Sequence, residues 1–187
     1  MDVGTLFTKV LAISTLLGNI FTVFFFVAHI GMQDLFRTIS LFINRNALRL
    51  GFLLAFAATF GSLAYSQVMG YPACILCWIQ RIFMYPEVAL FGIALWHNNR
   101  KVFPYALLLA ILGGAIALYN WVKDMLAIYT NMSLACPVVP GLPSCDHIYV
   151  DEFGYITIAM LSLNAFILIA IVCYTALRMD NKLQHVA

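Results

Sequence analysis

Five long apolar segments constrain the fold of this chain more than any other feature of its sequence. They cover residues 6–29, 50–69, 78–96, 102–122 and 153–177. The hydrocarbon core of a bilayer is about 30 Å thick, and about 20 residues of α-helix cross it. Because lipid offers no hydrogen-bond partners, the backbone amides must bond within each segment, so these segments are predicted to be helices. The expected fold class is an all-α membrane protein.

The composition supports a membrane protein and argues against several function classes. Of the 187 residues, 64% are hydrophobic and 10% are charged, which is more apolar surface than a soluble domain of this size can bury. The net charge of +2 is too small to suggest a nucleic-acid partner. The first segment is too long for the apolar region of a signal peptide, which has about 7–15 residues, so it is predicted to remain as a membrane span.

The Lys and Arg residues are distributed unequally between the loops, and this predicts an orientation. Short loops rich in Lys and Arg stay in the cytoplasm. Most of these residues fall on one side by helix parity, namely Arg37, Arg45, Arg49, Arg100, Lys101, Arg178 and Lys182. The opposite side has only Lys9 and Lys123, with Arg81 just inside the start of a helix. The N-terminus is therefore expected outside and the C-terminus inside, with residues 34–45 lying flat on the inner membrane surface as a connector.

Four of the five cysteines fall on the predicted outer side. Cys74 and Cys77 precede the third span, while Cys136 and Cys145 lie in the long loop before the last span. Thiols on the outside of a cell membrane tend to become disulfides. Four cysteines allow three connectivities, among which the spacing favours 74–77 and 136–145. Cys173 lies inside the last span and is expected to pack as a small apolar side chain.

The first cysteine pair stands where a helix is expected to begin, in the run Gly70-Tyr-Pro-Ala-Cys-Ile-Leu-Cys-Trp-Ile-Gln-Arg81. Pro72 suits the first turn of a helix, because its missing N–H would be unpaired there. Cys74 and Cys77 then lie three residues apart on one face. The positive end of the helix dipole favours a thiolate, which makes the disulfide form a good oxidant. The pattern therefore indicates a redox-active pair.

The second cysteine pair encloses the run Cys136-Pro-Val-Val-Pro-Gly-Leu-Pro-Ser-Cys145. Its prolines and glycine oppose regular helix and leave backbone exposed, so we expect an accessible disulfide that a thiolate of another protein can attack. Two alternatives stay open for the four cysteines. They can staple the outer loops as structural disulfides, or they can bind zinc together with His147. The loose spacing of the second pair and the competition from oxidation argue against zinc, so no metal is expected.

The run Cys74-Ile-Leu-Cys77-Trp-Ile-Gln-Arg81-Ile-Phe-Met-Tyr-Pro86 resembles the DsbB/BdbC family of disulfide-forming membrane proteins. The order of motifs is also similar: a looser cysteine pair follows, and then Phe153-Gly-Tyr-Ile-Thr157. The resemblance covers residues 50–177. It implies a four-helix transmembrane redox bundle over residues 50–187, preceded by one additional N-terminal transmembrane helix and an interfacial linker over residues 1–49.

The resemblance also implies a reaction, namely disulfide bond formation in exported proteins. A secreted thioredoxin-fold dithiol oxidase, similar to DsbA, is expected to reduce the loop disulfide. Cys136 would form the mixed disulfide with this partner and Cys145 would resolve it. The electrons would pass to Cys74 and Cys77 and then to a membrane quinone, ubiquinone or menaquinone. The implied location is the bacterial cytoplasmic membrane.

Two residues of the same helix are expected to contact the quinone. Arg81 follows Cys77 by one turn, where its charge can stabilise a thiolate and a reduced quinone oxygen; alternatively it snorkels to lipid headgroups. Trp78 either contacts the quinone or sits at the interface as an aromatic anchor. Glu87 falls near mid-membrane, where it is expected either to relay protons or to be protonated and bonded to a neighbour such as Asn120.

Two other functions remain as alternatives. Vitamin K epoxide reductase-like proteins also bundle four helices around a quinone, but in that family the loop pair precedes the Cys-x-x-Cys pair, and here it follows. A structural membrane subunit would use its disulfides only as staples. A staple should resist mild reductant, whereas a working pair should be trapped partly reduced when quinone is absent.

Overall fold

The computed structural model describes residues 3–130, 132, 136, 140–145 and 147–184. Within them the chain forms five α-helices, namely α1 (Val3–Gly31), α2 (Gln33–Leu63), α3 (Ile75–Trp96), α4 (Phe103–Thr130) and α5 (Ile158–Gln184). A π-helical turn, η1 (Ala64–Val68), continues α2, and a 3₁₀ turn, η2 (Arg100–Val102), precedes α4. The described residues form no β-strand. The all-α fold expected from the sequence is confirmed.

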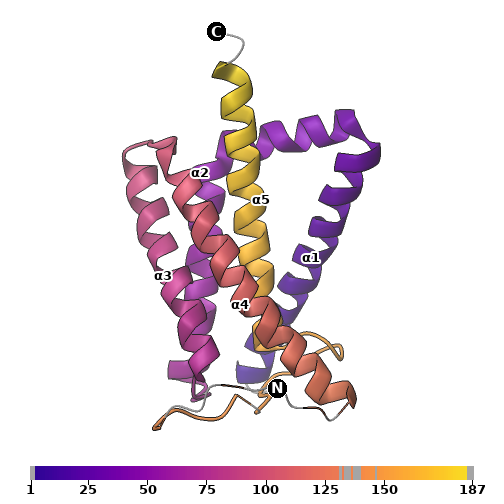
Figure 1. The fold of residues 1–187 in the computed structure, drawn as a ribbon, viewed down its shortest axis with the longest axis vertical. Helices are drawn as coiled ribbons and strands as arrows, with labels where there is room; N and C mark the ends of the chain where they lie inside the picture. The colour runs from indigo at the N-terminus through magenta and orange to yellow at the C-terminus, as the bar shows by residue number, and fades with distance from the viewer. Residues whose placement is uncertain (1–2, 131, 133–135, 137–139, 146, 185–187) are drawn as a thin grey trace.

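Four helices make a bundle, and α1 lies against its edge (Figure 1). Helix α5 packs against α4 and α2, and α3 packs against α2 and α4, while α1 contacts α5 and α2. The end of α5 and the α1–α2 and α3–α4 connections lie at one end of the bundle (Figure 1). The start of α1 and the segments that follow η1 and α4 lie at the other end. Which end faces the cytoplasm stays a prediction.

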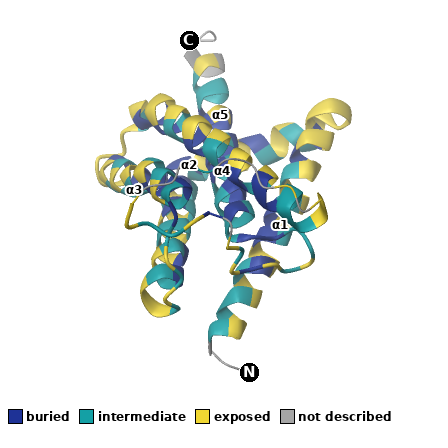
Figure 2. Ribbon diagram, turned by 60° about the horizontal axis from the view of Figure 1, so that its bottom comes forward, coloured by how far each residue is buried: buried dark blue, intermediate teal, exposed yellow. Residues whose placement is uncertain are grey.

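Four helical segments are long and apolar enough to cross a membrane, and they cover Gly4–Gly31, Gln33–Val68, Arg100–Thr130 and Ile158–Asn181. The third expected span, α3, is not among them because it carries polar side chains such as Arg81 and Glu87. Its 22 residues still rise about 33 Å, enough to reach across the hydrocarbon core. Exposed residues lie mainly on the outward faces of the helices (Figure 2), and many of them are large and apolar, as lipid contact requires.

The start of α2 differs from the sequence-based expectation. A separate connector over residues 34–45 was expected, but a single helix runs from Gln33 to Leu63. Its first part crosses the end of the bundle and its remainder turns along the other helices (Figure 1). Residues 33–50 contain no Gly or Pro, so no residue there ends the helix.

Two further helix boundaries were predicted wrongly. Helix α3 begins at Ile75, with Cys74 as its extended N-cap residue at ψ 172°, so Pro72 lies before the helix instead of in its first turn. Helix α4 continues to Thr130, because residues 123–130 also lack Gly and Pro. Lys123, expected in an outer loop, is therefore helical and is buried.

The bundle is closed by aromatic rings packed against glycine backbone. A Cβ atom at Gly113 would lie 2.3 Å from the ring of Phe166, and one at Gly51 would lie 2.5 Å from the ring of Phe91. Side chains at these two positions would clash, so the glycines permit close helix packing. Cys173 is fully buried in the same core, as the sequence predicted.

Candidate redox site

Cys74 and Cys77 lie together at the start of α3. Cys74 is the N-cap residue, and its carbonyl accepts a hydrogen bond from the backbone N–H of Trp78 at 3.0 Å. The two sulfur atoms are 3.2 Å apart, so one thiol can donate a hydrogen bond to the other. Both cysteines are free thiols in this structure. A disulfide bond is about 2.05 Å long, so a small movement of both side chains would close it.

The environment of Cys74 favours its thiolate. The hydrogen bond from Cys77 is the main cause that lowers the pKa of Cys74, from an ordinary value of 9.0 to about 6. The positive charge of Lys123 acts in the same direction, while burial of the sulfur opposes both. A thiolate is the nucleophilic form of cysteine, so this position suits thiol–disulfide exchange near neutral pH.

Cys136 and Cys145 form a disulfide, with their Cα atoms 6.1 Å apart. This is the pairing that the sequence spacing favoured. Cys145 is buried and Cys136 is half-buried. Residues 137–139 of the proline-containing run lie outside the described residues.

The two cysteine pairs meet at the same end of the bundle. Cys74, Leu76 and Cys145 form one buried cluster, and Cys77 and Cys136 pack against it. The sequence placed both pairs on one side of the membrane but could not show that they touch a common cluster. Among the described residues, no group of three or more His, Cys, Asp or Glu side chains is arranged to hold a metal ion.

Lys123 is a site residue that the sequence analysis missed. It is 2% exposed, its ammonium group donates a hydrogen bond to the backbone carbonyl of Cys145, and it pairs with the carboxylate of Asp124 at 3.2 Å. Helix α4 thereby fixes the position of the loop disulfide. The adjacent Lys-Asp pair at the end of an apolar segment was a signal, because a buried charge requires a partner nearby.

A cavity of about 290 Å³ opens beside the cysteines. Its end near the cysteines is lined by Cys74, Cys77, Cys145, Gln80, Arg81 and Tyr85. From there an apolar arm extends between the helices, lined by residues such as Leu54 and Ala58 of α2 and Leu168 of α5. The volume is at the lower limit of small-molecule sites, which span about 300–1,000 Å³.

Arg81 is held inside the protein and faces this cavity. It is 8% exposed, and its Nε and Nη2 atoms donate to the hydroxyl and the carbonyl of Ser62 at 3.0 and 2.9 Å. No carboxylate of the described residues pairs with it. Burial against α2 replaces the alternative of snorkelling to lipid headgroups. Because its charge is not neutralised by an acid, it remains available to a negatively charged group in the cavity.

The ring of Trp78 packs against the guanidinium group of Arg81. The ring centroid is 5.2 Å from the guanidinium carbon of Arg81, and the side chain is 45% exposed. It is not among the residues that line the cavity. A direct contact between Trp78 and a quinone therefore stays a prediction, whereas its packing under the guanidinium fixes the orientation of Arg81.

Glu87 is fully buried in α3, about three turns from Cys77. Its carboxyl oxygens have no hydrogen-bond partner among the described residues, so the alternative in which Glu87 bonds to a neighbour such as Asn120 was wrong. Asn120 lines the cavity and Glu87 does not. A role for Glu87 in proton transfer stays a prediction.

The family model described as "Disulfide bond formation protein DsbB" matches residues 44–176 of the chain. The match includes both cysteine pairs, Arg81 and Lys123, and it excludes α1. The chain belongs to the DsbB family. It is therefore an integral membrane protein of disulfide bond formation, and DsbB membership implies disulfide oxidoreductase activity.

Curated relatives carry consistent names. A probable disulfide formation protein C 1 of Bacillus anthracis is 39% identical over 124 residues, which are 66% of this chain and 86% of the relative. The disulfide bond formation protein C of Bacillus subtilis is 39% identical over 119 residues, 64% of this chain and 83% of the relative. A probable disulfide formation protein of Coxiella burnetii is 32% identical over 148 residues, 79% of this chain and 99% of the relative. No solved structure matches the chain significantly.

Proposed function

We propose that this DsbB family member is a thiol:quinone oxidoreductase. It reoxidises an extracytoplasmic thioredoxin-fold dithiol oxidase, similar to DsbA, and passes the electrons to a membrane quinone. The observation that carries the proposal is that a closed loop disulfide, an adjacent free dithiol and a cavity with a buried arginine meet in one place. The unequal distribution of Lys and Arg supports placing the cysteine end outside the cytoplasm.

The first exchange takes place at the loop disulfide. A thiolate of the reduced partner attacks Cys136, the Cys136–Cys145 bond breaks, and Cys145 leaves as a thiolate. The second thiol of the partner then attacks the mixed disulfide, so the partner leaves oxidised and Cys136 becomes a thiol. Electron balance thus assigns Cys145 the role of leaving group, because its own attack on the mixed disulfide only restores the starting pair.

The second exchange takes place between the two pairs. The Cys145 thiolate attacks the Cys74–Cys77 disulfide, and Cys136 then attacks the resulting mixed disulfide. The loop disulfide closes again, and Cys74 and Cys77 become thiols that hold the two electrons and two protons. The structure has the sulfur oxidation states that follow this step, since the loop pair is bonded and the helix pair is free.

The cavity has the chemistry that a quinone ring requires. Gln80 Nε2 and the Tyr85 hydroxyl are buried without a hydrogen-bond partner among the described residues, and both residues line the cavity beside Arg81. Buried polar groups of native proteins are nearly always satisfied, so these donors fit a ligand with carbonyl oxygens. A quinone, when bound, accepts two electrons and two protons. Arg81 favours negative charge on the acceptor oxygen, and Cys77 lies on the same wall one turn away.

The experiment that tests the proposal measures quinone reduction by the purified protein. Turnover is expected only when a reduced thioredoxin-fold partner is supplied, and a Cys77→Ser variant should show none. Cys173→Ser is the matched control, because Cys173 lies in a different core, and it should keep full activity. Full activity of Cys77→Ser would rule out the proposal.

A trapping experiment tests the entry point of the electrons. A partner that lacks its second thiol should accumulate as a mixed disulfide with the wild-type protein, and a Cys136→Ala variant should abolish this species. A structural staple predicts no adduct in either case.

The order of the cysteine pairs in this chain and its membership of the DsbB family both argue against a vitamin K epoxide reductase-like enzyme.

A further inference from the structure

Helix α1 lies outside the family match, yet it forms part of the cavity wall. The match begins at residue 44, whereas Leu11, Ser14 and Thr15 of α1 line the cavity together with α2 and α5. Most of the opposite face of α1 is exposed, for example at Leu17 and Val23, and in a bilayer it faces lipid. Helix α1 therefore separates the cavity from the lipid along the seam between α2 and α5.

Specific contacts with two helical segments hold α1 against the bundle. The amide of Asn164 in α5 donates to Asn19 Oδ1 at 2.7 Å, and Gly18 lies so close that a Cβ atom there would be 2.4 Å from Asn164 Oδ1. On the α2 side, the Phe7 and Tyr65 rings meet edge to face with centroids 5.7 Å apart. A polar pair and small residues are typical contacts between membrane helices.

The apolar arm of the cavity runs along the surface where α1 contacts the bundle. Leu54 and Tyr65 both line the cavity, and the helical residues between them rise about 16 Å. The residues that line the cavity here include Ala57 and Ala58 of α2, Ala165 of α5 and Thr15 of α1. Thr15 is 5% exposed, and its hydroxyl donates to the carbonyl of Leu11 at 3.0 Å, so its own donor is already used.

A cavity of about 290 Å³ accommodates a quinone ring but not a whole isoprenoid tail, so a tail must extend along the arm or leave past α1. We propose that α1 is the lateral wall of the quinone site and that Thr15 and the Gly18 contact with Asn164 determine how well a tail-bearing quinone fits. The proposal rests on the proposed quinone reductase function and names a specificity-determining element for it.

The test compares KM for tail-bearing and tail-less forms of one quinone ring, either decyl-ubiquinone with its tail-less ring or menaquinone with menadione. In Thr15→Leu the added bulk enters the arm. We expect KM for the tail-bearing form to rise about tenfold with less than about twofold change for the tail-less form, because one misfitting methylene group changes affinity by about 10–200-fold. The kcat should stay unchanged.

A second variant moves the wall instead of filling the arm. Gly18→Leu forces α1 away from Asn164 and should also raise KM for the tail-bearing quinone alone. Gly31→Leu is the matched control, because nothing lies within 4 Å of that position, and its KM values should equal those of the wild type. Folding is monitored through the reduction of the loop disulfide by dithiothreitol without quinone, which should be unchanged in all three variants.

The outcomes separate this inference from the function on which it rests. If the wild type reduces no quinone form, the proposed function fails and the inference with it. If the wild type reduces quinone but Thr15→Leu and Gly18→Leu behave like Gly31→Leu, α1 plays no part in quinone selection. An equal rise of KM for both quinone forms also overturns the proposal, because a wall for the tail should not affect the bare ring.

Discussion

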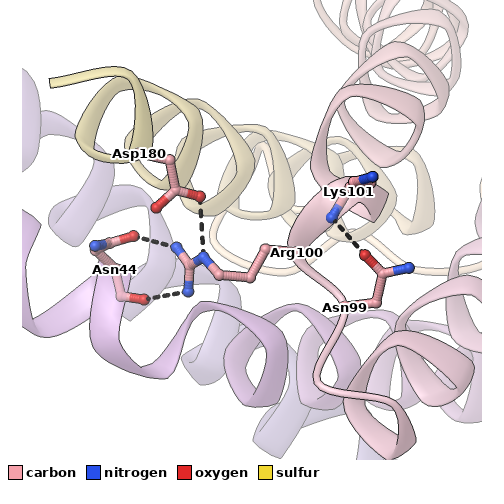
Figure 3. Close-up of polar contacts among 5 residues, drawn as sticks. All are labelled: Asn44, Asn99, Arg100, Lys101 and Asp180. Carbon is pink, nitrogen blue, oxygen red and sulfur yellow. Dashed lines mark hydrogen bonds and ion pairs between the residues drawn. The ribbon is translucent and has the colours of Figure 1, made fainter. Parts of the chain in front are cut away.

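The two ends of the bundle each hold an arginine, but the surroundings of the two side chains differ. Arg100, at the end away from the cysteines, donates through Nε to Asp180 at 2.9 Å and through Nη1 to the carbonyl of Asn44 at 3.2 Å. Its Nη2 donates to the side chain of Asn44, so all its nitrogen atoms are partnered (Figure 3). Arg100 thereby joins α2, η2 and α5.

Arg81, at the cysteine end, has a different set of contacts. Its two hydrogen bonds both go to Ser62, no carboxylate of the described residues neutralises it, and it faces a cavity. A fully partnered charge mainly fixes structure, whereas a buried charge left without an acid is costly and marks a functional site in a membrane. The comparison predicts that changes at the cysteine end reduce activity and changes at the other end reduce stability.

The largest expected effect is on Arg81. In Arg81→Met, quinone reduction should fall about 10²–10³-fold, the usual cost of removing one preorganised electrostatic contact. The dithiol-driven reduction of the loop disulfide should continue, because Arg81 acts at the quinone end of the relay. Arg81→Lys keeps the charge and should recover part of the activity. Steady-state kinetics with and without quinone measure both, and normal turnover of Arg81→Met would contradict the comparison.

The next effect concerns the ionisation of Cys74. Because the pKa of Cys74 is lowered to about 6, its thiolate should predominate above pH 6, and alkylation of the fully reduced protein should reach half its maximal rate near that pH. Cys77→Ala removes the main stabilising hydrogen bond. The midpoint should then move upward, with the thiolate fraction at neutral pH falling roughly tenfold for each pKa unit regained. A midpoint that does not move would show that Cys77 plays no such part.

Substitution of Lys123, at the same end of the bundle, should have a smaller effect on activity. Lys123→Met removes the hydrogen bond to the carbonyl of Cys145, and a bond from a charged donor contributes about 1.5–3 kcal/mol. Exchange between the two cysteine pairs should slow about tenfold. The double variant Lys123→Met/Asp124→Asn avoids an unpaired buried carboxylate and should show the same slowing. Rapid-quench trapping of the thiols measures the rate, and normal exchange in the double variant would exclude a positioning role.

The smallest effect is expected at the opposite end. In Arg100→Gln the pair with Asp180 and the hydrogen bonds to Asn44 are lost. The paired side chains are 35% and 31% exposed, so solvent screens the pair and its contribution is about 0.2–1 kcal/mol, while each bond to Asn44 contributes about 0.5–1.5 kcal/mol. The melting temperature should fall by about 2–4 °C for each kcal/mol lost, with kcat unchanged. Thermal unfolding in detergent and a parallel activity assay test this, and a loss of activity without a loss of stability would reverse the comparison.

Local sequence patterns were enough to predict the number and order of the helices. Hydropathy identified the spans and the Cys-x-x-Cys motif marked the start of α3, because both depend on residues that are neighbours in the chain. Helix continuity was less predictable, since α2 runs through the expected connector without an internal stop signal. The burial of Lys123 was missed for the same reason, because residues 123–130 also lack Gly and Pro and α4 continues past the apolar segment.

The parts of the site that come from distant segments were not predictable from one sequence. The contact of Cys145 with Cys74, the bond from Arg81 to Ser62 and the place of α1 beside the cavity each join separate helices. Tertiary packing determines such contacts, and helical periodicity and motif spacing carry no information about it. The bond from Glu87 to Asn120 failed as a prediction, because the position of a residue along one helix does not tell which side chain of another helix it meets, and the Glu87 carboxyl oxygens have no hydrogen-bond partner among the described residues.

An odd number of cysteines is a hazard for an exchange catalyst, because a fifth thiol can intercept a mixed disulfide and strand the chain in a dead-end pairing. The location of Cys173 removes this hazard. Its sulfur is fully enclosed in the main hydrophobic core, whereas the other four belong to a separate cluster. Burial thus separates the fifth thiol from the four cysteines that can exchange disulfides with one another.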